Sequence, residues 1–378
     1  MLIVIAIVVI FAIVTGIHLY LWKRLVRDAL VGRARRRAGF GVIGLAVLIP
    51  LALVGERLVP QGWRPFLAWP GYVWIALMFY LLVTLAILEI PRLVTKIAAR
   101  KRFAEDPSRR LLLGRSLAVT AGVASVAATG IGIVEALGTP NLKHVPIRLR
   151  KLPASMEGFK IALVSDIHLG PLLGRSHTEQ IVRIINSTDA DLVAVVGDLV
   201  DGSVAELGHA AEPLQDLRAK HGSFFVTGNH EYFSGVEQWI EEVTSFGLTV
   251  LRNKRVEIDG LDLAGVNDAT GGGAGDPPDY AKALDGRDAA RPVVLLAHQP
   301  VQAHEAAKHG VDLQLSGHTH GGQMVPFNLI VRLQQPIIAG LGTIDGTQVY
   351  VTRGAGFWGP PVRFGAPPDI SLVELHSA

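Results

Sequence analysis

Residues 313–320, Leu-Gln-Leu-Ser-Gly-His-Thr-His, join a short apolar run to two histidines that stand two positions apart. The same order, an apolar run followed at once by a metal-ligand side chain, occurs at four other places in the chain. Such runs are typical of buried strands, and loops at strand ends hold the chemistry of α/β domains. The five segments are Asp166-Ile-His168, Gly197-Asp198, Gly228-Asn229-His230-Glu231, Ala297-His298 and Gly317-His318-Thr319-His320. Together they predict a metal centre at one edge of the domain.

Each segment taken alone has an ordinary structural explanation. Asp166 or Asp198 could be a turn or cap residue, because Asp bonds its own backbone in turns. Asn229 could be a left-handed turn residue, and His298 could be a hydrogen-bonded structural histidine. The ordered combination of all five segments favours a metal site over these explanations.

Charge divides the chain of 378 residues into two parts. Residues 1–144 hold 18 Lys and Arg against 6 Asp and Glu, a net charge of +12, whereas residues 145–378 hold 18 against 27, a net charge of −9. Apolar runs dominate the first part, and the second is a mixed sequence long enough to bury one α/β core. We therefore expect a transmembrane region over residues 1–144 and a globular domain over residues 145–378, with the boundary near Asn141–Pro146.

Four apolar runs of the first part are long enough, at about 1.5 Å per helical residue, to cross a hydrocarbon core of about 30 Å. They are Leu2–Trp22, Gly39–Gly55 with a few flanking residues, Trp69–Leu88 and Ser116–Leu137. Positive charges follow the first run instead of preceding it, which favours an uncleaved span over a signal peptide. The few charged residues lie near span ends, which argues against an ion pathway. We expect a bundle of four transmembrane helices.

Basic residues in the connections predict an orientation. The loops after the first and third spans carry seven Lys and Arg each, whereas Arg57 and Arg64 lie between the second and third spans. Because basic loops stay in the cytoplasm, we expect a multi-pass protein of the cell membrane whose globular domain is extracytoplasmic. Residues 108–113, Ser-Arg-Arg-Leu-Leu-Leu, resemble a twin-arginine export signal, and their use for export stays open. The absence of cysteine excludes disulfides and thiolate metal sites.

Apolar runs alternate with amphipathic stretches in the second part, which indicates stacked α and β layers. The expected strands are residues 159–165, 191–196, 223–226, 261–266, 292–297 and 311–315, and the expected helices are 177–185, 205–219, 236–246 and 303–308. Residues 269–278, with Gly-Gly-Gly and Pro-Pro, are expected to form a flexible surface loop. The amphipathic stretch Met324–Leu333 is either an exposed loop or a segment that dips into a membrane interface.

The five segments in this order resemble the calcineurin-like metallophosphoesterase superfamily, over about residues 155–376. Its pattern is Asp-x-His, Gly-Asp, Gly-Asn-His-Glu/Asp, a strand-end His and Gly-His-x-His. Residues 351–356 and 361–370 resemble the tail of the bacterial membrane-associated branch, which includes YkuE-type and multi-span transmembrane members. Ala366 and Asp369 depart from that tail, where Cys and Glu are expected. The resemblance implies a four-layer α/β/β/α sandwich and a metal-dependent phosphoric ester hydrolase.

The resemblance also implies roles for single residues. Asp166, His168 and His320 would bind one metal ion, Asn229, His298 and His318 a second, and Asp198 would bridge the two. His230 would be the general acid, Glu231 would orient a histidine, and Arg353 and Arg363 are candidate phosphate clamps. Mixed nitrogen and oxygen ligation suits Mn, Fe or Zn better than Mg²⁺ or Ca²⁺.

Three functions stay open at this point. The first is a membrane-anchored phosphomonoesterase or phosphodiesterase that attacks a lipid or cell-envelope ester with a metal-bridging hydroxide, outside the cytoplasmic membrane. The second is a cytoplasm-facing pyrophosphate hydrolase that acts on a nucleotide-linked lipid. The third is a non-catalytic membrane scaffold, which predicts a broken ligand set, although none of the expected positions is missing. We expect the lipid bilayer and a phosphoester as partners and no nucleic acid, and the oligomeric state stays open.

Overall fold

The computed structural model describes residues 2–98 and 107–378. The chain forms two compact units, Met1–Gly132 with Gly359–Val362 and Ile133–Trp358 with Arg363–Ala378. Arg100, Lys101 and Arg102, which belong to the second basic loop predicted above, lie outside the described residues.

Four long helices make up the first unit, and the last of them ends in the second unit. They are α1 (Leu2–Leu21), which continues as a π-helical turn over Trp22–Arg27, α2 (Gly32–Leu53), α3 (Arg64–Ala98) and α4 (Pro107–Leu137). Short 3₁₀ helices at Gly55–Leu58 and Gln61–Trp63 connect α2 to α3. Segments Val8–Arg27, Gly32–Leu53, Arg64–Pro91 and Ser108–Leu137 are each long and apolar enough to cross a membrane. The prediction of four spans is confirmed.

Small residues and paired polar groups hold the helices of the first unit together. A Cβ on Gly71 of α3 would lie 2.2 Å from Cβ of Ala52 in α2, so only glycine permits this close approach. The indole of Trp74 donates to Nε2 of His18 at 3.1 Å. Nε of Arg24 lies 2.8 Å from a carboxylate oxygen of Glu89. One hydrogen bond and one ion pair therefore join polar side chains within this apolar unit.

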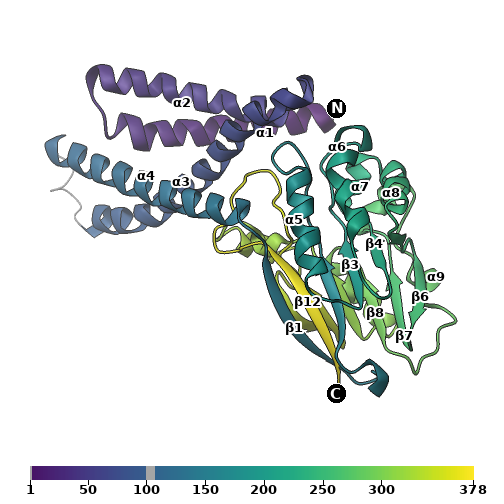
Figure 1. Ribbon diagram of the computed structural model, residues 1–378. Helices are drawn as coiled ribbons and strands as arrows, with labels where there is room; N and C mark the ends of the chain where they lie inside the picture. Colours follow the sequence, from purple (N-terminus) through teal and green to yellow (C-terminus); the bar gives the residue numbers. More distant parts are fainter. Residues whose placement is uncertain (1, 99–106) are drawn as a thin grey trace. The chain divides into compact units, whose positions relative to one another are not determined.

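Two six-stranded sheets form the centre of the second unit (Figure 1). The first has the order β1-β12-β2-β3-β4-β5, with β1 (Asn141–Leu149), β2 (Phe159–Val164), β3 (Leu192–Val196), β4 (Ser223–Val226), β5 (Thr249–Val250) and β12 (Asp369–Ser377). The second has the order β10-β11-β9-β8-β7-β6, with β6 (Lys254–Ile258), β7 (Leu261–Gly265), β8 (Val293–Leu296), β9 (Leu313–Ser316), β10 (Gly340–Ile344) and β11 (Thr347–Val351). Strands β2 to β5 are parallel, and so are β7, β8, β9 and β11. The carboxyl ends of these strands therefore meet at one edge of each sheet.

Helices cover the outer faces of both sheets. On the first sheet pack α5 (Arg175–Asn186), α6 (Val204–Ala211) and α8 (Val236–Ser245), and on the second pack α9 (Tyr280–Leu284) and α10 (Ala303–Lys308). Side chains alternate along β2: Ile161 and Leu163 belong to the core between the sheets, whereas Ala162 and Val164 face the helices. The predicted four-layer α/β/β/α sandwich is confirmed.

The six predicted strands are present, with ends that differ by at most two residues. The four predicted helices are present too, although the one expected at 205–219 changes at Glu212 into a 3₁₀ helix that contains Pro213. The predicted loop at 269–278 includes a 3₁₀ helix, Ala269–Ala274, which Asp268 caps by accepting from the amide of Thr270. Strands β1, β5, β6, β10, β11 and β12 were not predicted.

Candidate metal centre

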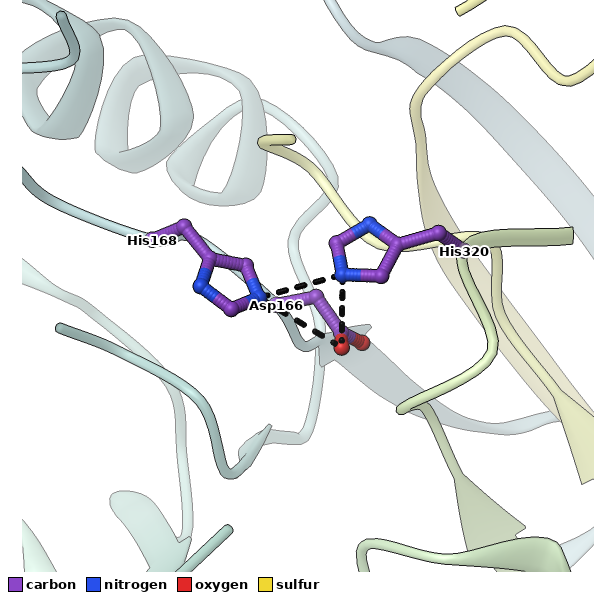
Figure 2. A group of neighbouring side chains, drawn as sticks. All are labelled: Asp166, His168 and His320. Atoms are coloured by element: carbon purple, nitrogen blue, oxygen red, sulfur yellow. Dashed lines mark hydrogen bonds and ion pairs between the residues drawn. The ribbon is translucent and has the colours of Figure 1, made fainter. Parts of the chain in front are cut away.

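Asp166, His168 and His320 converge at the ends of β2 and β9 (Figure 2). Oδ1 of Asp166 lies 3.4 Å from Nε2 of His320 and 4.0 Å from Nε2 of His168, and the two Nε2 atoms are 3.0 Å apart. Three potential ligand atoms therefore surround one point. Carboxylate oxygen and imidazole nitrogen are ligands that divalent transition metals accept together.

Asp198, His298 and His318 form a second group of potential ligands. Oδ2 of Asp198 lies 3.1 Å from Nε2 of His298 and 3.7 Å from Nε2 of His168. The rings of His298 and His318 are edge to face, with centroids 5.1 Å apart. The carboxylate of Asp198, on the loop after β3, therefore borders both groups.

Hydrogen bonds behind two of the imidazoles determine which ring nitrogen has a free lone pair. Nδ1 of His168 lies 2.9 Å from Oδ1 of Asp201, and Nδ1 of His298 lies 2.8 Å from the carbonyl oxygen of Val196. Both oxygens accept, so both Nδ1 atoms carry the proton. In its neutral form each ring then presents the lone pair of Nε2 to the cluster, as in metal-ligating histidines.

Asn229 begins α7 (Asn229–Ser234), just after β4. Its Oδ1 is buried and has no hydrogen-bond partner among the residues that the structure describes. A buried amide oxygen without a donor costs about 1–3 kcal/mol, which coordination of a cation would offset. The residues present thus fit a pair of divalent cations in both donor type and arrangement.

The carboxylate of Glu231 holds two of the ligand loops together. It accepts the backbone N–H groups of Asp198 at 2.9 Å, Leu199 at 2.7 Å and Gly228 at 2.6 Å. The sequence predicts that Glu231 orients a histidine, whereas the hydrogen bonds of its buried carboxylate go to backbone amides of the loops. A Cβ on Gly228 would lie 2.2 Å from Oδ1 of Asp198, so the close approach of the loops requires glycine. Burial and the charge of Asp198 raise the pKa of Glu231 to about 6.

Five residues of the two groups have left-handed backbone conformations. The φ angles of Asp166, His168, Asp198, His318 and His320 are 53°, 49°, 53°, 70° and 51°. A non-glycine residue held in this region costs on the order of 1–3 kcal/mol, and such residues gather at functional sites. The abrupt turn after each strand turns the ligand side chains toward one another.

Burial and neighbouring charges shift the pKa values of several residues of the site in opposite directions. Burial disfavours charge on His168, but the carboxylates of Asp201, Asp198 and Asp166 outweigh it and raise its pKa to about 9. Burial likewise works against ionisation of Asp198, yet His298 and His168 hold the pKa of that carboxyl well below its usual range. Burial holds the pKa of His320 well below its usual range. The carboxylate of Asp198 therefore stays ionised within the cluster.

Asp201 is a site residue that the sequence reasoning missed. Its Oδ1 lies 2.9 Å from Nδ1 of His168 and 2.7 Å from Nδ1 of His230. The backbone N–H of His230 donates to Oδ1 of Asp198 at 2.9 Å. The signal that could have found Asp201 is its spacing, three positions after Asp198 on the same loop.

The two arginines of the tail are placed differently. Arg363 is fully buried; its guanidinium lies 2.7 Å from Nδ1 of His320 and donates to the carbonyl oxygen of Ala366 at 2.8 Å and to that of Arg353 at 2.6 Å. Burial lowers its pKa to about 10. These bonds to protein atoms speak against the predicted phosphate clamp at Arg363. Arg353 is only partly buried, and its aliphatic stem lies beside Gly321, which follows His320.

Asp369, where the resemblance implied Glu, supports this loop. It accepts from the hydroxyl of Thr352, from the amide of Arg353 at 3.1 Å and from the ammonium of Lys143. Its shorter side chain therefore still fixes the backbone that carries Arg353.

The four-layer fold and the two ligand groups define a metal-dependent phosphoester hydrolase. Residues 159–322 match the family described as calcineurin-like phosphoesterase. The chain is 35% identical over 384 residues to the transmembrane protein with metallophosphoesterase domain of Danio rerio. The alignment covers 95% of this chain and 86% of that protein. It belongs to the calcineurin-like metallophosphoesterase family.

Bacterial relatives match most of the chain as well. The chain is 40% identical over 272 residues to a metallophosphoesterase of Helicobacter pylori strain J99, with 71% of this chain and 73% of that protein covered. It is 31% identical over 290 residues to the metallophosphoesterase YkuE of Bacillus subtilis, with 71% and 98% covered. The predicted resemblance and enzyme class are thus confirmed, and family membership implies divalent metal ions. The four apolar helices and the transmembrane relatives make the chain a membrane protein.

Proposed function

We propose that the chain is a membrane-anchored phosphoesterase with a dinuclear metal centre. It hydrolyses a phosphomonoester or phosphodiester of a lipid or of the cell envelope, outside the cytoplasmic membrane. Residues 1–144 are the transmembrane region, and residues 145–378 are the catalytic domain. The observation that supports this proposal best is the position of the Asp198 carboxylate, 3.7 Å from His168 of one ligand group and 3.1 Å from His298 of the other.

The two groups assign the ligands of the centre. Asp166, His168 and His320 would hold one ion, Asn229, His298 and His318 the other, and Asp198 both. Two ions bound there would lower the pKa of a water molecule and neutralise charge that grows on the phosphoryl oxygens. The mixture of imidazole, carboxylate and amide ligands favours Mn, Fe or Zn.

His230 is placed to give a proton to the leaving oxygen. Its Nδ1 faces Asp201 at 2.7 Å, so the ring orientation is held from one side and Nε2 stays available. A carboxylate that holds a catalytic imidazole in one tautomer is a recurring arrangement in hydrolases. Arg353 is the residue that we assign to a phosphoryl oxygen, because its guanidinium extends from a partly buried stem beside Gly321.

The membrane anchor supports a substrate that resides in the membrane or the envelope. A site tethered to a bilayer meets lipid phosphates at a high effective concentration without any additional contact. The excess of Lys and Arg in two connections of the transmembrane region supports an extracytoplasmic catalytic domain.

The experiment that tests the function uses the purified full chain in nanodiscs, loaded in turn with Mn²⁺, Zn²⁺ or Fe²⁺. We expect release of phosphate or of a phosphomonoester from a panel of lipid phosphates, and none from the Asp198→Asn variant. Activity in that variant equal to the unmodified chain would overturn the bridging assignment. Reporter fusions placed after Ala378 determine the side of the membrane: an active cytoplasmic reporter would replace the proposed orientation with the cytoplasm-facing pyrophosphate hydrolase.

A further inference from the structure

The exposed large apolar side chains of the second unit share one end of the two sheets. Among the described residues of this unit they are Val134, Leu137, Leu142, Phe233, Val301, Phe327, Leu329, Ile330, Leu333, Leu341 and Trp358. Phe233 lies in α7 after β4, Val301 follows β8, and Trp358 follows β11. The segments after β4 and β8 also carry the candidate ligands Asn229 and His298, and β11 is parallel to β9, whose end carries His318 and His320.

The pairing of the remaining strands agrees with this distribution. Leu142 in β1 is paired with Ile370 in β12. The next residue of β12, Ser371, is paired with Leu163, which lies near the carboxyl end of β2. Leu142 therefore lies at the same end of the sheet as the carboxyl end of β2. Leu341 is paired with Tyr350 near the carboxyl end of β11. In the described chain, no large apolar side chain of this unit is exposed at the opposite end of the sheets, where loops such as 218–222 and 285–292 are rich in charge.

The longest of these segments follows β9. It includes α11 (Asn328–Val331), around which Leu329, Ile330 and Leu333 are exposed, Leu333 to 83%. Arg332 is exposed between them. Apolar side chains interleaved with a basic residue suit the boundary between acyl chains and anionic headgroups. Single exposed apolar residues are ordinary, but a contiguous set marks an interaction surface.

The end of a membrane-crossing helix belongs to the same end of the unit. Ala136, in the last turn of α4, packs with Leu173 and Phe357. Phe357 precedes Trp358, whose amide donates to Oε1 of Gln323 at 3.0 Å and whose carbonyl oxygen accepts from Nε2 of Gln323 at 2.9 Å. The last turn of α4, the Trp358 loop and the chain leading to α11 are therefore connected within one unit.

The apolar side chains also reach the residue that we assign as the general acid. The ring of His230 is edge to face with Phe233 and with Trp358, at centroid distances of 5.6 Å and 6.1 Å. A leaving alcohol that receives its proton from His230 would thus lie beside two aromatic rings. Trp is enriched where proteins meet the interfacial layer of a bilayer, because its ring is apolar and its N–H is polar.

We propose that this end of the second unit, with Phe233, Trp358 and residues 327–333, lies on the lipid bilayer that α4 crosses. Its apolar side chains insert into the interfacial layer, and the metal centre opens toward phosphoesters that the membrane presents. The docking follows from the placement of the apolar residues and of α4, whereas the use of membrane phosphoesters rests on the proposed function.

The absence of cysteine from the chain makes a direct test possible. Leu333→Cys and Phe233→Cys each accept one environment-sensitive fluorophore, and Lys220→Cys serves as the matched control, because Lys220 is exposed at the opposite end of the sheets. The labelled full chains are reconstituted into vesicles of phosphatidylcholine and phosphatidylglycerol that contain nitroxide-labelled lipid. We expect quenching at positions 333 and 233 to be at least about threefold stronger than at position 220.

Equal quenching at positions 333 and 220, whether weak or strong, would overturn the proposal. The same measurement in an Asp198→Asn background separates docking from catalysis. We expect the quenching pattern to persist there while phosphoester turnover is lost, since docking does not involve the ligands. A chain that docks but hydrolyses none of the lipid phosphates would contradict the proposed function alone.

Discussion

Oδ1 of Asp201 lies 2.7 Å from Nδ1 of His230, and the same oxygen receives Nδ1 of His168 at 2.9 Å. One carboxylate thus orients both the imidazole assigned to the leaving group and an imidazole assigned to a metal ion. Burial works against its ionisation, but the two histidines outweigh burial and lower the pKa of Asp201 to about 2. Asp201 is therefore a positioning residue that connects acid catalysis with metal ligation.

Replacement of His230 should affect poor leaving groups more than good ones. In His230→Asn we expect kcat for an alkyl phosphoester to fall by about 100- to 10,000-fold, the usual contribution of a general acid, with little change in KM. The loss on a nitrophenyl ester should be much smaller, because nitrophenolate leaves without a proton. His209→Asn, at an exposed histidine, is the matched control. Equal losses on both esters would contradict the assignment.

Asp201→Asn should combine a weaker form of that effect with a loss of metal affinity. We expect about a 10- to 100-fold decrease in affinity, as for other partners of metal-bound histidines. Metal titration followed by kinetics at saturating metal separates the two contributions. If saturating metal restored the full rate on alkyl esters, Asp201 would have no part in orienting His230.

Chelation should remove both activity and stability. A ligand that binds the folded state alone at about 1000 times its Kd stabilises it by about 4 kcal/mol, so EDTA should lower the thermal unfolding midpoint of the full chain in detergent. Re-addition of Mn²⁺ or Zn²⁺ should restore the midpoint. The Asp198→Asn variant should show a smaller response to EDTA, whereas Asp259→Asn, at an exposed turn, should respond like the unmodified chain. An unfolding midpoint that EDTA leaves unchanged would argue against a metal at this cluster.

Acid should destabilise the second unit through His177. This residue is buried in α5 with Nε2 unpaired among the described residues, and burial lowers its pKa to about 4. An unfolded histidine has a pKa of about 6.5, so between pH 6.5 and 4 the unfolded state binds more protons, and the free energy of unfolding falls by about 3 kcal/mol as the pH drops. Urea titrations of His177→Leu should lack this part of the pH dependence. A variant with the same slope as the unmodified chain would show that other groups cause it.

Trp358 should influence the choice between long-chain and short-chain substrates. In Trp358→Ser we expect kcat/KM for a vesicle-borne long-chain phosphoester to fall by about tenfold relative to that for a short soluble ester, because an aromatic ring beside an apolar chain contributes about 1–1.5 kcal/mol. Trp358→Phe should retain most of the preference. If the ratio of kcat/KM for the long-chain ester to that for the short ester were unchanged in Trp358→Ser, the indole would have no part in substrate selection.

The sequence predicted the elements whose pattern is local. Leu192–Val196 was recognisable because a strand buried on both faces is an uninterrupted apolar run. Strand β12 was missed because Asp369, Ser371 and Glu374 interrupt its apolar residues, and its partner β1 is more than 200 residues earlier in the chain. Ligand-type residues stood out because each follows such a run. The contact between Arg363 and His320 depends on the geometry of two loops, which the spacing of residues in the sequence does not encode.

The left-handed conformation of the ligand-bearing residues limits which amino acids can replace them. At Asp166, Asp198 and His318, φ is 53°, 53° and 70°, a region in which β-branched side chains are strongly disfavoured and Asn, Asp, His and Gly are tolerated. These are nearly the same amino acids that metal chemistry selects. The backbone conformation and metal coordination therefore each limit these positions to nearly the same amino acids. Substitution at them stays restricted by the backbone even in a descendant that no longer needs the reaction.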